Sequence, residues 1–281
     1  MSPMLPRGLP ALLLLLLAPA AVEATAGDAT TETWCSPRLG ETRRAGGCVH
    51  RIRDALPQKD ARRLHAYVAD AWRAGRFLYA TNCERQRRCR CGNAKRRFAA
   101  KEAAKEKAVA ASCRASFPFT YSKWELARRD ATALVLEAAI RRAVKPRLEA
   151  IVGPLANLTD WFASAFSDGD WLGNHTDGGL GDVAFILNLS PDPAFRGGDL
   201  VFADGLRAAP AFNTLSAFRV GRGAHPLRHR VAEVTYSRRG PGELAAPRFA
   251  VTGWWTAVGG DPRSVSQGVL EQERAAPRRA R

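Results

Sequence analysis

The sequence lacks several features that define other protein classes. After its first 26 residues it has no apolar run of the roughly 20 residues that a membrane-spanning helix needs, so we expect no stable membrane span. It has no internal repeat and no alternation of strands with helices, which argues against a doubly wound parallel sheet. Its C-terminal half has no cysteine, because all six lie between Cys35 and Cys113.

The one long apolar run lies at the N-terminus. Arg7 provides a positive flank, Leu12 to Leu17 form the apolar core, and Ala24-Thr25-Ala26 resembles a small-residue cleavage site. Residues 1–26 are therefore predicted to be a secretory signal peptide; the run is short for a bilayer, so a signal anchor is the less favoured alternative. We expect the protein in the secretory pathway, either in the endoplasmic reticulum lumen or secreted.

An even number of cysteines in an oxidising compartment favours disulfides over free thiols. The pairings that we favour are Cys35 with Cys48 and Cys83 with Cys113. A zinc site at Cys89 and Cys91 is the alternative, but their spacing suits zinc poorly and no histidine lies nearby.

The formal net charge is +16, and much of the excess lies in the segment 84–114, which has eleven basic and three acidic residues. In a secreted protein, such a segment most often forms a solvated helix with Lys/Glu pairs. A docking surface for an acidic partner or an anionic membrane is the second interpretation. Nucleic acid is not expected as a partner.

The chain divides into regions that differ in composition and in the pattern of apolar residues. Residues 27–122 form a basic, cysteine-containing region, irregular up to residue 58 and helical at 60–74 and 94–112. A third helix is predicted from about Lys123 to Ala150, with Pro146 expected to kink or divide it. After residue 154, short β-rich runs alternate with Gly, Pro and Asp, which indicates an all-β sandwich or barrel. Residues 259–281 are predicted to be a disordered tail.

The segment WLGNHTDGG contains the strongest candidate site. His175 and Asp177 are two residues apart, so at the end of a strand both side chains point to the same side. Two histidines and one carboxylate are the ligand set of non-haem iron(II) oxygenases. The second histidine is His229 or His225; we favour His229, because HRVAEV resembles a buried strand and GRGAHP resembles a loop.

Arg248 begins the last strong strand candidate, RFAVTGWW. If this strand is a neighbour of the His229 strand, its guanidinium projects into the cavity that holds the metal. A buried arginine is costly unless an anion pairs with it, and a dicarboxylate co-substrate is such an anion. Thr252 lies on the same strand face and can add a hydroxyl contact.

From about Leu158 to Val258 the chain resembles the iron(II)- and 2-oxoglutarate-dependent dioxygenases, in the prolyl 4-hydroxylase-like branch. The resemblance is carried by five segments in the family's order: FSDGDWLGNHTD, FILNLS, FRGGDLVFAD, HRVAEV and RFAVTGWW. It implies an all-β catalytic core, a double-stranded β-helix (jelly roll), with N-terminal helices packed on it and an α+β fold overall. The dioxygenase domain with its leading support helix would span residues 123–258.

The resemblance also implies a chemistry. His175, Asp177 and His229 would bind Fe(II), Arg248 would bind 2-oxoglutarate, and ascorbate would keep the iron reduced. By its place on the strand face, Thr252 is the second residue expected to contact 2-oxoglutarate. The substrates would be O2 and a peptide or protein, most favourably at proline. The alternatives are a hydroxylase of lysine or of a small molecule, a jelly-roll binding module without turnover, and a polyanion-binding protein that uses the basic segment.

Overall fold

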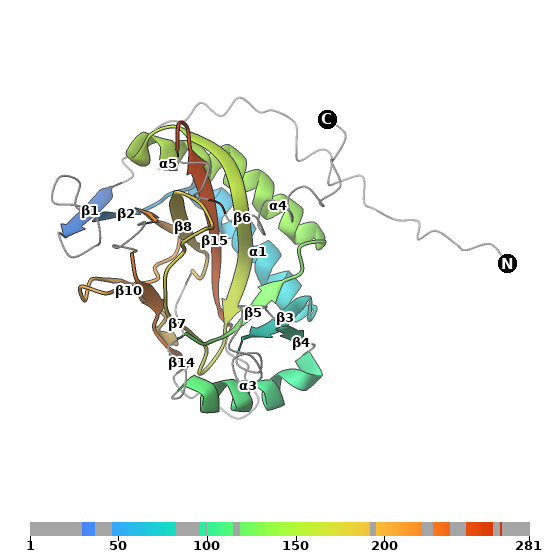
Figure 1. Ribbon diagram of the computed structural model, residues 1–281. Coiled ribbons are helices and arrows are strands. Elements are labelled where there is room, and N and C mark those ends of the chain that lie inside the picture. The colour runs from blue at the N-terminus through green and yellow to red at the C-terminus, as the bar shows by residue number, and fades with distance from the viewer. Residues whose placement is uncertain are drawn as a thin grey trace, which may run out of the picture.

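The computed structural model describes residues 30–36, 47–82, 96–98, 100–114, 119–191, 195–220, 227–236, 246–260 and 265 (Figure 1). The predicted signal peptide, His225 and nearly all of the predicted tail lie outside these ranges. Within them, no helix combines the length and the apolarity that crossing a lipid bilayer requires.

One curled antiparallel sheet forms the centre of the molecule. Eight of its strands are, in chain order, β6 (Leu155–Phe166), β7 (Trp171–His175), β8 (Val183–Asn188), β10 (Leu200–Phe202), β11 (Arg207–Ala208), β12 (Thr214–Arg219), β13 (His229–Val231) and β15 (Arg248–Ala257). They pair in the order β12-β8-β15-β6 in one half and β7-β13-β10-β11 in the other. This exchange of strands between two facing halves is that of a jelly roll, so the predicted fold class is confirmed.

A further strand, β5 (Tyr121–Leu126), joins the two halves because it pairs with both β6 and β7. On its other side β5 pairs with β3 (Phe77–Thr81), which pairs with β4 (Arg96–Phe98). β9 (Phe195–Gly197) and β14 (Val234–Tyr236) form a separate two-stranded ribbon.

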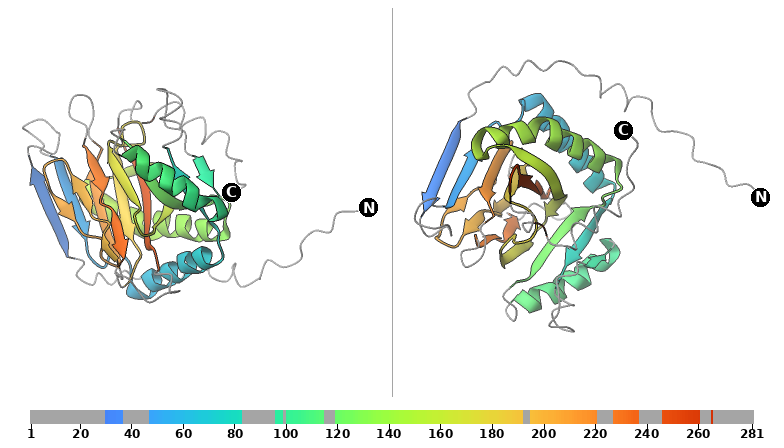
Figure 2. Two further views of the ribbon diagram at one scale, coloured as in Figure 1. Left: turned by 90° about the horizontal axis from the view of Figure 1, so that it is seen from below. Right: turned by 45° about the horizontal axis from the view of Figure 1, so that its top comes forward.

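The N-terminal region extends the sheet, which corrects the prediction that residues 27–58 are irregular. β1 (Thr31–Ser36) and β2 (Gly47–Ile52) form an antiparallel pair, and β2 pairs with β12. Figure 2 shows this pair, in blue, at one edge of the sheet. The predicted disulfide between Cys35 and Cys48 is present and closes the pair. Cys113 is also disulfide-bonded, whereas Cys83, Cys89 and Cys91 lie outside the described residues.

Helices cover the outer face of the β12-β8-β15-β6 half. α1 (Gln58–Arg73), α4 (Ala131–Ala139) and α5 (Lys145–Val152) contribute buried apolar residues to one cluster, together with outward-facing residues of β15 such as Phe249 and Val251. In Figure 1, α1 and α4 lie behind β6 and β15. α3 (Ala100–Arg114) contacts β3, β4 and β5 instead.

The predicted helix from Lys123 to Ala150 begins too early, because residues 121–126 form β5. The helix starts only after Asp130, whose carboxylate accepts a hydrogen bond from the Thr132 amide at 2.8 Å. A π-helical turn, η3 (Ile140–Val144), then precedes Pro146. The helix is therefore interrupted close to Pro146, as predicted. A proline has no N–H to donate, so it disturbs the hydrogen bonding of a helix.

Candidate metal centre

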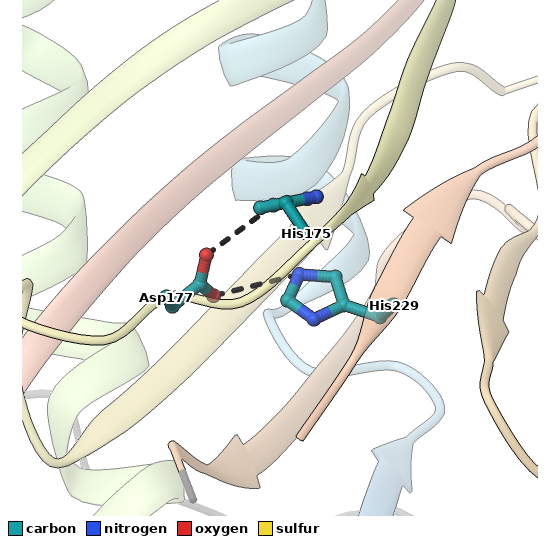
Figure 3. A group of neighbouring side chains, drawn as sticks. All are labelled: His175, Asp177 and His229. Carbon is teal, nitrogen blue, oxygen red and sulfur yellow. Dashed lines mark ion pairs between the residues drawn. The ribbon is translucent and has the colours of Figure 1, made fainter. Parts of the chain in front are cut away.

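Three potential metal ligands come together between the two halves of the jelly roll (Figure 3). His175 is the last residue of β7, Asp177 follows in the next turn, and His229 is the first residue of β13. The two histidines are paired across the β7–β13 ladder. One nitrogen or oxygen atom from each of the three residues lies within 4.8 Å of the others. The structure thus brings together the three residues predicted from the sequence.

Backbone carbonyl groups orient both imidazole rings. Nδ1 of His175 lies 2.8 Å from the Gly173 carbonyl, and Nδ1 of His229 lies 3.3 Å from the Leu227 carbonyl. A carbonyl only accepts hydrogen bonds, so Nδ1 is the donor in both rings, which leaves Nε2 as the nitrogen available to a metal. The Nε2 atoms face the carboxylate of Asp177, at 3.3 and 3.5 Å. Each ring therefore presents a metal-binding nitrogen to the same point.

The surroundings keep the ligands in the protonation states that metal binding requires. Burial alone would raise the pKa of Asp177, but the two neighbouring histidines outweigh burial and hold that pKa well below its usual value. Burial lowers the pKa of His229 to about 4, against the opposing attraction of Asp177. At neutral pH the site therefore offers an anionic carboxylate and a neutral His229 imidazole.

The donor set fits a divalent transition metal. Two imidazole nitrogens and one carboxylate on one side, with open positions on the other, are the arrangement used by non-haem iron(II) oxygenases. The open side faces a cavity of about 590 Å³ whose wall includes all three residues. Phe119 stacks on the His175 ring at 5.1 Å and restrains that ring. Three ligands and an adjoining cavity leave room for a metal and for molecules bound to it.

Arg248 gives the same cavity a buried positive charge. Its side chain is 3% exposed, and one guanidinium nitrogen donates to Asn188 Oδ1 at 3.0 Å. Its Nε atom has no hydrogen-bond partner, and within the described ranges no carboxylate lies at ion-pair distance from it. Burial lowers the pKa of Arg248 to about 10. An anion in the cavity would satisfy this guanidinium, so the residue fits a carboxylate-binding role.

Gly198 makes the space in which Arg248 lies. Its backbone has φ of +71°, and a Cβ atom there would lie 2.7 Å from Cδ of Arg248. On its other side, the guanidinium lies 5.1 Å from the ring centre of Phe166. The position of the guanidinium is therefore defined by packing as well as by its hydrogen bond.

The strands of His229 and Arg248 are not neighbours, although the sequence-based expectation for Arg248 assumed that they were. β13 pairs with β7 and β10, whereas β15 pairs with β6 and β8. The two residues reach the same cavity because the sheet curls and its halves face each other. Along β15 every second residue lines that cavity, namely Arg248, Ala250, Thr252 and Trp254, so Thr252 lies on the expected face.

β5 carries a buried ion pair that was not predicted from the sequence. Lys123 lines the cavity at 3% exposure, and its ammonium lies 3.1 Å from Glu125 and 3.6 Å from the ring centre of Phe162. The signal was present, since Tyr121, Lys123 and Glu125 alternate with the less polar Trp124 and Leu126. This segment was instead predicted to begin the helix from about Lys123 to Ala150.

Part of the basic segment is used within the fold. Lys107 of α3 lies 3.0 Å from the fully buried carboxylate of Asp170, the residue before β7. Arg114 forms an ion pair with Glu233, and its guanidinium lies 4.8 Å from the ring centre of Trp171. These two cations fasten α3 to the jelly roll next to the strand that carries His175.

Similarity to known proteins is found at the level of structure. No protein-family model and no curated protein matches the sequence. The structure is similar to a prolyl-4-hydroxylase from Pseudomonas putida, with 15% identity and a TM-score of 0.45 over 75% of this chain and 92% of that one. It is also similar to an oxidoreductase of the 2OG-Fe(II) oxygenase family from Burkholderia pseudomallei, with 15% identity and a TM-score of 0.36 over 71% and 93%.

Proposed function

We propose that the chain is an Fe(II)- and 2-oxoglutarate-dependent dioxygenase of the secretory pathway that hydroxylates a peptidyl residue, with proline as the preferred target. The proposal rests on one observation: a cluster of potential metal ligands and a buried guanidinium line the same cavity. His175, Asp177 and His229 would supply the metal ligands, and Arg248 is a buried cation without a carboxylate partner in the described structure. An oxygenase that uses a dicarboxylate co-substrate needs both.

In this proposal, the three ligands hold Fe(II) through Nε2 of each histidine and a carboxylate oxygen of Asp177. Bound iron supplies oxygen activation, which couples decarboxylation of 2-oxoglutarate to succinate with insertion of one oxygen atom into a C–H bond. The protein positions the reactants and excludes water. Iron(II), the Asp177 carboxylate and the Arg248 guanidinium sum to two positive charges, which the two carboxylates of 2-oxoglutarate neutralise. Thr252 contributes a hydroxyl on the same wall.

The wall of the cavity favours an apolar target over lysine. Near the metal ligands it is formed by apolar side chains that include Phe119, Leu172, Leu180 and Trp254. A proline ring buries apolar surface against such groups. A lysine side chain would instead bring an ammonium towards Arg228, which lines the same cavity and has no partner in the described ranges, and like charges repel.

The compartment and the reductant are part of the same proposal. The Cys35–Cys48 disulfide supports a location in the secretory pathway, because disulfides persist in oxidising compartments and are rare in the cytosol. Ascorbate is proposed as the reductant that restores Fe(II) between turnovers. Omitting ascorbate should shorten the linear phase of turnover without changing the initial rate.

The test is succinate formation from 2-oxoglutarate with added Fe(II), followed with proline-rich peptides and with matched peptides in which alanine replaces proline. We expect turnover that requires iron, is lost in Asp177→Ala and His229→Ala, and persists in His225→Ala. Turnover that is lost in His225→Ala but survives in His229→Ala would overturn the choice of ligand. Tight Fe(II) binding with no succinate under any condition would identify a binding module and contradict the proposed activity.

A further inference from the structure

The charged groups on the cavity wall can be matched with their partners one by one. Among the residues that line it, those with a formal charge are Lys123, Asp160, Asp177, Arg228 and Arg248. Lys123 pairs with Glu125, Asp160 pairs with Arg128, and Asp177 lies between the two histidines. Under the proposed function, Asp177 binds iron and Arg248 binds 2-oxoglutarate. Arg228 is the one charge left without a partner in the described part of the chain.

Arg228 occupies a position where its charge acts on an incoming substrate. It is exposed, and it immediately precedes the ligand His229. The other lining residues next to the metal ligands in sequence are uncharged, namely Asn174, Thr176 and Gly178. The rim beside the metal ligands therefore carries an uncompensated positive charge, and the apolar wall behind it concentrates the field at the opening.

We propose that Arg228 is a specificity-determining residue that selects peptides with an aspartate or glutamate side chain close to the residue that is hydroxylated. The inference rests on the proposed function, which it deepens by naming the substrate class. A guanidinium binds a carboxylate through two parallel hydrogen bonds, whereas a lysine or arginine at the same position of the peptide is repelled. The overall charge of +16 favours the same class of peptide, but only Arg228 places a free charge beside the metal ligands.

The experiment compares three peptides that differ at one position, two residues from a central proline: aspartate, asparagine or lysine. Wild-type protein, Arg228→Gln and Arg228→Glu are assayed for kcat/KM. Peptide binding is measured separately, by fluorescence anisotropy on Mn(II)-loaded protein that does not turn over. Arg230→Gln is the matched control, because Arg230 is exposed and belongs to β13 but does not line the cavity.

For the wild type we expect kcat/KM to be about 10-fold higher for the aspartate peptide than for the lysine peptide at low salt, and the ratio to be smaller at high salt. This magnitude is that of one exposed charge that attracts the aspartate and repels the lysine. Arg228→Gln should remove most of the preference for aspartate, Arg228→Glu should favour lysine, and Arg230→Gln should behave as the wild type.

Equal use of the three peptides by the wild type, or the same loss of preference in Arg230→Gln, would overturn the role of Arg228. So would a failure of all three peptides to bind at millimolar concentration. Absence of succinate formation by the wild type would contradict the proposed function instead, and the anisotropy measurements would still decide the preference for acidic peptides.

Discussion

The buried guanidinium of Arg248 should have opposite effects on the protein with and without its ligand, and Arg248→Met separates the two. Removing one partner of a buried ion pair costs about 3 kcal/mol or more. The Kd of 2-oxoglutarate should therefore rise roughly 150-fold. Arg248→Lys keeps the charge and should lose less.

The ligand-free protein should become more stable in the same variant. The pKa of Arg248 is lowered to about 10 by burial, so the folded state disfavours the charged form. That penalty is present at every pH below about 10 and disappears only above it. A fall from 12.5 to about 10 corresponds to about 3 kcal/mol, and loss of the hydrogen bond to Asn188 offsets about 1 kcal/mol of this. The free energy of unfolding should increase by about 2 kcal/mol.

The two effects are measured by calorimetric titration of 2-oxoglutarate into Mn(II)-loaded protein, and by urea unfolding without metal or ligand. Arg219→Met is the control, because Arg219 is exposed, donates to the Val152 carbonyl and does not line the cavity. Unchanged affinity in Arg248→Met would refute the carboxylate-binding role. A ligand-free variant several kcal/mol less stable than the wild type would show that Arg248 serves the fold instead.

Three further predictions concern the candidate metal ligands, the packing of Gly198 against Arg248 and the N-terminal strand pair. Asp177→Ala should weaken Mn(II) binding, measured by paramagnetic resonance, by more than about 100-fold, since even outer-shell partners are worth about 10- to 100-fold; retained affinity would exclude this carboxylate as a ligand. Gly198→Ala should raise the Kd of 2-oxoglutarate about 10-fold by pushing on Arg248, whereas Gly205→Ala, at φ of +90° with nothing within 4 Å, should cost only the backbone strain of about 1 kcal/mol; equal Kd values would remove the proposed contact. The double variant of Cys35 and Cys48 to serine should lower the urea-derived stability by about 3 kcal/mol and leave 2-oxoglutarate affinity unchanged; weakened binding would show that the strand pair supports the cavity.

The parts of the fold predicted correctly are those whose signal is local. The change in sequence pattern after residue 154 indicated the β region, because short apolar runs bounded by Gly, Pro and Asp are typical of strands joined by turns. The Cys35–Cys48 pair was predicted and is present. The His-x-Asp spacing placed two ligands on one side of a strand end, a consequence of backbone geometry alone.

The errors occurred where distant contacts override local pattern. Lys123 and Glu125 resemble the polar side of a helix, yet both are buried, because they pair with each other and Lys123 packs on Phe162. Residues 31–36 and 47–52 appear polar and irregular in the sequence, yet they form strands, because a disulfide joins them and β2 pairs with β12. Arg228 was not predicted as a site residue, since nothing in the local sequence distinguishes one exposed arginine in a strongly basic chain from another.

The sequence by itself determined the chemical groups that this protein can bring to a site: two imidazoles, a carboxylate and an arginine at the start of a strand. Only the tertiary structure decided that they share one cavity, that both imidazoles turn Nε2 towards Asp177, and that Arg248 is left without a carboxylate partner in the described chain. The physical reason is that β7, β13 and β15 are not three consecutive neighbours in the sheet. The curl of the sheet makes them face one another, and it depends on pairing between strands far apart in the chain.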